Sequence, residues 1–184
     1  LGPAPALRHD LSSRMGVHAV MQPRDKGNGF LLGVTVFLSA AAALAVEIIA
    51  VRIMAPVVGM SLYTWTAIIA VVLAGLSIGH WAAGRLYEDT EVPGRGDAVI
   101  AGSLALAGLA TIGAAYLRLL ALDVVDSLGG VGIPSIIALS ILLFFAPSFF
   151  VGIVAPAATT LALADEAVDR GRTIGRMFAL GAAG

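Results

Sequence analysis

The chain has 184 residues, of which 59% are hydrophobic and 12% are charged, and its mean hydropathy is +0.95. Soluble domains carry about 25% charged residues, so the composition excludes that class. The net charge is −1 and the eleven basic residues lie between apolar blocks, which argues against nucleic-acid binding. Because the chain has no cysteine, disulfides, thiolate metal sites and cysteine nucleophiles are excluded.

A polar segment, residues 1–29, precedes the first apolar block and lacks the apolar core and cleavage site of a signal peptide. We expect a flexible cytoplasmic tail there. Each of the four apolar blocks that follow exceeds the roughly 20 residues that a helix needs to cross the hydrocarbon core. These uniform runs lack the alternation of barrel strands, so they are predicted to be helices. The predicted helices are 30–55, 62–87, 98–120 and 131–164.

The fourth block is too long for one straight span. Pro134 suits a helix start, whereas Pro147 and Pro156 each remove a backbone donor, so we expect a kinked or broken helix. A further apolar run, 173–184, begins and stops short, and we expect the chain to be truncated there. The predicted fold is an all-α polytopic bundle of four transmembrane helices plus the start of a fifth, and residues 30–184 form its transmembrane domain.

Basic residues predict the orientation of the bundle. Nine of them lie in the tail, in the connection between the second and third spans and after the fourth span, whereas two, Arg52 and Arg118, lie on the opposite side. By the positive-inside rule the N-terminus is cytoplasmic. The second span carries aromatic residues at both ends, as interfacial anchors should be placed. These are Tyr63, Trp65, Trp81 and Tyr87.

Glu47 is the sharpest chemical feature, because it lies in the first span among apolar residues. A carboxylate in a span is costly and by default faces a bundle interior or a wet cavity. Glu47 is therefore either a proton or cation site or a structural acid that holds two helices in register. Arg52 lies about 140° around the helix from Glu47, so the two are poor partners. We expect Arg52 to extend to the outer interface or to pair with another helix.

His80 lies near the cytoplasmic end of the second span. It could shuttle a proton, although a lone histidine there more often bonds a backbone group or a lipid headgroup. Glu47 lies toward the outer side on this topology, so we do not expect a direct pair with His80. Gly75 and Gly79 form a G-x-x-x-G pattern that Gly84 continues, which predicts close helix packing. No catalytic site, metal site or cofactor is predicted.

From about residue 30 onward the chain contains five short sequence elements in order. The first helix has a glutamate and an arginine five positions apart, and a glycine-serine-tyrosine turn and a glycine-rich second helix follow it. A proline-glycine-proline element and a closing glycine-arginine element come later. The five elements fall on Glu47 and Arg52; on Gly59, Ser61 and Tyr63; on Gly75, Gly79, Gly84 and Arg85; on Pro147, Gly152 and Pro156; and on Gly171, Arg172 and Gly175. In this order they resemble the N-terminal part of the membrane-integrated spermidine synthase-like proteins of prokaryotes.

The resemblance implies a prokaryotic plasma (inner) membrane protein whose helices precede a soluble aminopropyltransferase domain. That domain has a Rossmann-like fold, a glycine-rich loop and aspartates that handle the amine. The 184 residues contain none of these elements, so we do not expect enzyme activity in this chain, and polyamine chemistry must belong to a missing segment or a partner. The chain departs from the family pattern at His80, where a small residue is usual, and at Gly181, where asparagine is expected.

A second, looser similarity is to half of a major-facilitator transporter. Such transporters carry a glycine-aspartate-glycine-arginine loop on the cytoplasmic side. Arg85, Asp89, Gly94 and Arg95 fit that loop only roughly.

Three functions remain open at this point. The first is a non-catalytic transmembrane module of a spermidine synthase-like protein, which anchors, oligomerises or forms a passage for a small amine. The second is a small proton-coupled exporter of cationic substrates that uses Glu47. The third is a structural subunit of a larger membrane complex. We expect lipid and either a second copy or a partner membrane subunit to cover the helices, with a polyamine as the candidate ligand.

Overall fold

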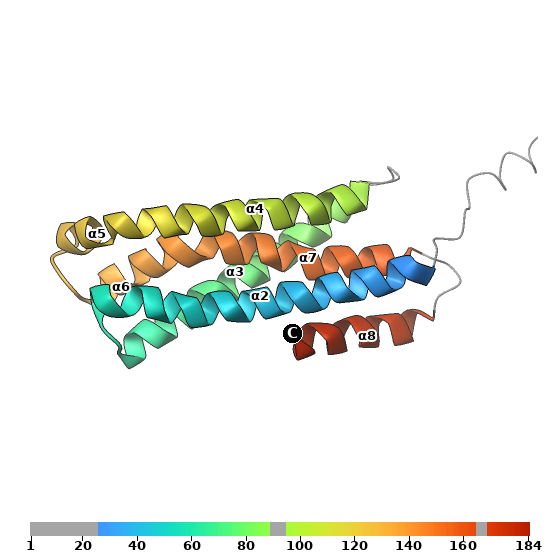
Figure 1. Cartoon of the computed structure of the whole chain (residues 1–184), viewed down its shortest axis with the longest axis horizontal. Coiled ribbons are helices and arrows are strands. Elements are labelled where there is room, and N and C mark those ends of the chain that lie inside the picture. The colour runs from blue at the N-terminus through green and yellow to red at the C-terminus, as the bar shows by residue number, and fades with distance from the viewer. Residues whose placement is uncertain (1–25, 89–94, 165–168) are drawn as a thin grey trace, which may run out of the picture.

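The computed structural model describes residues 26–88, 95–164 and 169–184, and within these ranges all regular structure is helical (Figure 1). The predicted tail lies outside the described residues up to position 25, and the first helix begins before its predicted start. The elements are α2 (Lys26–Val58), α3 (Leu62–Glu88), α4 (Arg95–Leu117), η1 (Arg118–Leu120), α5 (Ala121–Ser127), α6 (Ile133–Ser140), η2 (Ile141–Phe145), α7 (Ala146–Leu163) and α8 (Arg170–Ala183).

Four helical spans are long and apolar enough to cross a membrane: Gly29–Val58, Leu62–Leu86, Gly96–Ser127 and Ile133–Leu163. Large apolar side chains on their outward faces stay exposed, among them those of Leu38, Ile49, Leu73 and Leu109. Such extensive apolar surface would be strongly unfavourable in water but suits contact with lipid tails. The chain is therefore an all-α, multi-pass membrane protein, and the predicted fold class is confirmed.

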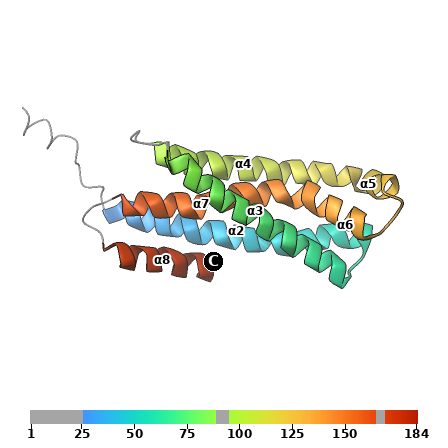
Figure 2. The ribbon, with the colours of Figure 1, turned by 180° about the vertical axis from the view of Figure 1, so that it is seen from behind.

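The fourth span lies at the centre of the bundle. Its second part, α7, contacts α2, α3, α4 and α8. Figure 1 shows α2 and α4 on the near side of the bundle, and Figure 2 shows α3 crossing the opposite side. Half of the most apolar window of this span is buried, against a third or less in the other three spans. Helix α7 therefore forms much of the interior of the bundle.

The fourth span changes its hydrogen-bonding pattern just before Pro147. The π-helical segment η2 joins α6 to α7, and Pro147 lies in the first turn of α7. Proline has no N–H to donate to the preceding turn, and π segments are one of the ways in which helices accommodate such a loss. The interruption expected at Pro147 takes this form, whereas α7 continues as a helix through Pro156. Pro134 lies in the first turn of α6.

The third span is longer than predicted. Helix α4 ends at Leu117, but one 3-10 turn, η1, connects it to α5, so the helical path reaches Ser127. Apart from Arg118, its continuation is apolar as far as Leu122, which gives the chain no reason to leave the membrane at residue 120. The turn that follows is made by Gly129 and Gly130, with φ of 84° and 102°. Glycine adopts these positive angles without the steric penalty of a side chain.

Helices α3 and α7 approach each other through glycines on both sides. A Cβ atom added to Gly152 would lie 2.6 Å from the carbonyl oxygen of Leu76, and one added to Gly75 or Gly79 would press against the backbone of α7. Such contacts need small residues, because any side chain would separate the backbones. Gly84 was expected to share this packing, but it is exposed and a Cβ there would meet nothing within 4 Å.

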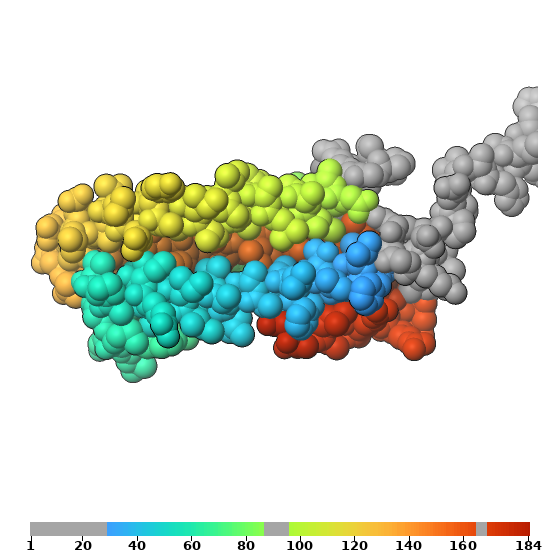
Figure 3. Space-filling model, viewed as in Figure 1, coloured from blue at the N-terminus to red at the C-terminus, as the bar shows by residue number. Residues whose placement is uncertain are grey.

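Two separate apolar clusters form the core. One includes Met54, Ile68 and Leu139, and the other, closer to the start of α2, includes Val36 and Met177. Helix α8 takes part in the second cluster only. Figure 3 shows α8 lying against the first half of α2 and leaving the second half of α2 uncovered on that side. Val36 and Met177 of the second cluster also line the cavity described below.

Candidate functional site

A partly open cavity of about 740 Å³ is lined by residues of α2, α3, α7 and α8. Most of its wall is apolar, and Leu44, Leu76 and Val151 are typical of it. Its size falls within the range of small-molecule sites, which are largely apolar and carry a few polar groups that fix orientation. The polar groups in this wall therefore indicate what the cavity can bind.

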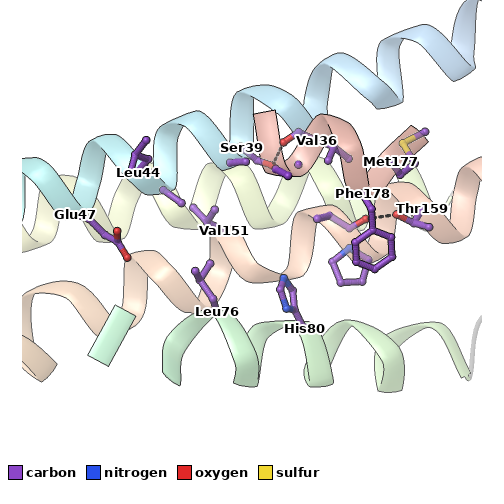
Figure 4. A pocket seen from close by; sticks show the side chains of 16 residues that line it. Val36, Ser39, Leu44, Glu47, Leu76, His80, Val151, Thr159, Met177 and Phe178 are labelled. Atoms are coloured by element: carbon purple, nitrogen blue, oxygen red, sulfur yellow. Dashed lines mark hydrogen bonds between the residues drawn. The ribbon is translucent and has the colours of Figure 1, made fainter. Parts of the chain in front are cut away.

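Glu47 is the acidic residue of the cavity wall. Its side chain is half-buried and extends from α2 into the cavity, whereas its neighbours Ile48 and Ile49 face outward (Figure 4). Among the described residues, no hydrogen bond or ion pair holds the Glu47 carboxylate. Both of its oxygens are thus available to a ligand, and an intramembrane acid in such a position is a candidate functional group.

His80 reaches the same cavity from α3. Figure 4 shows Leu76 and Val151 between it and Glu47. Within the part of the chain that the structure describes, no hydrogen bond joins the two side chains. The structure therefore brings Glu47 and His80 into one cavity without making them a direct pair. Their predicted depths in the membrane differ, so a shared cavity wall was not expected from the sequence.

Two hydroxyl groups complete the polar wall, and the sequence analysis did not single them out. Ser39 Oγ donates to the carbonyl oxygen of Val36 at 2.9 Å, and Thr159 Oγ1 donates to the carbonyl oxygen of Ala155 at 2.8 Å. Both residues line the cavity. Their polarity within a predicted span could have marked them as candidate site residues. However, serine and threonine are common in membrane helices, because they donate hydrogen bonds to the backbone of their own helix, so polarity alone does not identify a site.

None of the basic residues that the structure describes lines this cavity. Arg52 is exposed on α2, beyond Glu47, and does not line the cavity. The guanidinium carbon of Arg85 lies 4.4 Å from the ring centroid of Trp81, in a cation–π contact near the end of α3. Tyr63, Trp65 and Trp81 are exposed, while the side chain of Tyr87 lies outside the described residues. Among the residues that the structure describes, Glu47 is thus the only acidic or basic side chain, apart from the imidazole of His80, in the cavity wall.

A metal site is not indicated by the described residues. Within 26–88, 95–164 and 169–184, no group of three or more His, Asp or Glu side chains lies close enough together to hold a metal ion. Glu47 and His80 by themselves supply too few ligands for a structural or catalytic zinc site, which takes three or four. The polar groups of the cavity are better suited to hydrogen bonding and charge pairing.

Comparisons with known proteins give no family assignment. The chain matches no protein-family model, no curated protein and no solved structure. What the structure establishes is the class, an all-α multi-pass membrane protein, with a partly open cavity whose wall includes a carboxylate. The resemblance stated above accordingly stays a prediction.

The absence of native cysteine allows a direct test of whether water reaches the cavity. Ala43 lines the cavity, whereas Ile48 is exposed on the outward face of the same helix. We expect Ala43→Cys in nanodiscs to react with a charged, water-soluble thiol reagent about tenfold faster than Ile48→Cys, because the thiolate is the nucleophile that attacks the reagent and lipid tails disfavour this charged form. Equal, slow labelling of both variants would show that lipid tails fill the cavity.

Proposed function

We propose that this chain is a non-catalytic membrane module that holds a small organic amine, with the Glu47 carboxylate as its counter-ion. The observation that carries the proposal is the placement of this unpaired acid in a cavity of about 740 Å³ whose remaining wall is mostly apolar. An ammonium group neutralises the carboxylate, and an alkyl body fits the apolar wall. Charge-assisted hydrogen bonds of this kind are roughly twice as strong as neutral ones.

The family resemblance supports the same class of ligand. In a spermidine synthase-like protein, a membrane module with an amine site would anchor the chain in the prokaryotic inner membrane and supply or pass an amine. The two positions where this chain departs from the resembled pattern, His80 and Gly181, both line the cavity. Their placement supports the view that these departures alter the ligand and leave the fold unchanged.

The test is equilibrium binding of spermidine to the purified chain in nanodiscs. We expect saturable binding by the wild type and a loss of at least tenfold in affinity for Glu47→Gln, which keeps the shape of the side chain but removes its charge. Asp126→Asn is the matched control, because Asp126 is an exposed acid on α5, away from the cavity. We expect Asp126→Asn to bind like the wild type.

Failure of well-folded wild-type protein to bind spermidine would contradict the proposal. Equal losses in Glu47→Gln and Asp126→Asn would contradict it too, because binding would then reflect general charge attraction.

The same cavity favours one alternative, the proton-coupled exporter. A carboxylate that is reached from a cavity can exchange a proton for a cationic substrate, which is the step such an exporter needs. The two functions differ in proteoliposomes. A module that only holds an amine gives no accumulation of spermidine when a pH gradient is imposed, whereas an exporter accumulates it in proportion to the gradient.

A further inference from the structure

We infer that the cavity recognises an elongated amine at two points, and that Ser39 and Thr159 select a ligand whose second end is a hydrogen-bond donor. This inference rests on the proposed function, since Glu47 supplies the first point. It adds the selecting residues and the chemistry of the second end, neither of which follows from the charge of Glu47.

The two recognition points lie at different depths in the cavity. Ser39 and Glu47 are eight positions apart on α2, so their Cα atoms lie about 12 Å apart along the helix axis. Figure 4 shows Glu47 at one end of the cavity and Thr159 at the other, with Ser39 and His80 on the Thr159 side of Leu76 and Val151. A ligand with its ammonium group at Glu47 must therefore extend past apolar side chains before it meets another polar group.

The hydroxyl groups at the second point are oriented as acceptors. Each already donates its single hydrogen to a backbone carbonyl of its own helix, Ser39 to Val36 and Thr159 to Ala155. A hydroxyl oxygen that has donated its hydrogen still carries lone pairs, so it can accept from a ligand. A ligand acceptor would have to break one of these helix bonds to obtain a donor from either residue.

His80 does not reverse this preference. A neutral imidazole carries one donor and one acceptor, so it can satisfy either kind of ligand group. Glu47, Ser39 and Thr159 offer acceptors, and the Glu47 charge disfavours a second carboxylate in the same cavity. The combined wall therefore favours a ligand with donors at both ends over an amino acid or a simple alkylamine.

The experiment compares hexylamine, 6-amino-1-hexanol, 1,6-diaminohexane and 6-aminohexanoic acid as competitors of spermidine in nanodiscs, with empty nanodiscs subtracted. A series from butyl to octyl chains locates the best length. We expect the two ligands with a donor at the second end to bind about tenfold more tightly than hexylamine, as one added hydrogen bond would give. We expect 6-aminohexanoic acid to bind more weakly than 6-amino-1-hexanol.

Ser39→Ala and Thr159→Val identify the residues responsible. Each should reduce the advantage of 6-amino-1-hexanol over hexylamine and leave the affinity for hexylamine itself within about twofold, because Glu47 still holds the ammonium group. A purely structural role would change the affinity for all four ligands equally. Ala45→Ser, on the outward side of α2 and outside the cavity, serves as a control that changes a hydroxyl elsewhere on the same helix.

The outcomes separate this inference from the proposed function. If all four ligands bind equally well and Glu47→Gln weakens all of them, the amine site stands and two-point selection is wrong. If hexylamine binds best at every chain length, the second point is apolar and the inference is overturned. If no amine binds to folded protein, the proposed function fails and the inference fails with it.

Discussion

Replacing Gly79 with alanine should separate α3 from α7 and lower the free energy of unfolding by about 3 kcal/mol. The added Cβ would overlap the carbonyl oxygen of Phe149 and press on the Cα atom of Gly152 at 3.0 Å. These are backbone atoms, so no rotamer change relieves the overlap and the two helices must move apart. The movement also disturbs the cavity wall, because His80 follows Gly79 directly. Unfolding in detergent, followed by circular dichroism, measures the loss.

Gly84→Ala is the matched control for this change. It lies five positions further along the same helix, it is exposed, and a Cβ there meets nothing within 4 Å. Alanine has a higher helix propensity than glycine, so this variant should match or slightly exceed the wild type in stability. If Gly79→Ala and Gly84→Ala melt alike, the close α3–α7 contact does not support the fold.

Composition and hydropathy were sufficient to predict the architecture. Spans of apolar residues exclude every fold but a helical membrane bundle, and the structure confirms that class. The helix ends were predicted less well. Sequence reasoning ended the third helix at residue 120, near Arg118, but one 3-10 turn carries the path to Ser127. A single polar side chain at the end of a span does not force the chain out, because a long arginine can extend to the interface.

The cavity itself could not be predicted from the chain. Glu47 was identifiable by its charge alone, but the wall depends on how α8 packs against α2 and α7. Periodicity places residues on one face of one helix and gives no information about which helix lies opposite. The close approach of Gly75 to Ser148 and of Gly79 to Gly152 fixes the crossing of α3 and α7, and Gly152 is 73 positions after Gly79. Ser39 and Thr159 meet one cavity only after such long-range contacts form.

The sign of a stability change at Glu47 distinguishes a ligand site from a structural acid. If Glu47 held two helices in register, removing its carboxylate would break a polar contact and destabilise the bundle. The described residues contain no such contact, because no hydrogen bond or ion pair holds the Glu47 side chain. An acid that is kept for a ligand instead lowers the stability of the empty protein, since it places an unpaired polar group within the membrane span.

Glu47→Leu should therefore raise the free energy of unfolding of the ligand-free protein by about 1 to 2 kcal/mol while it abolishes amine binding. Spermidine at about 100 times its dissociation constant should stabilise the wild type by about 2.7 kcal/mol and leave Glu47→Leu unchanged. Asp126→Leu, which removes an exposed acid outside the cavity, should alter neither quantity by more than about 0.5 kcal/mol. Thermal unfolding with and without spermidine measures both effects in one series. A Glu47→Leu variant that unfolds earlier than the wild type would identify Glu47 as a structural acid and would favour a scaffold subunit over an amine-binding module.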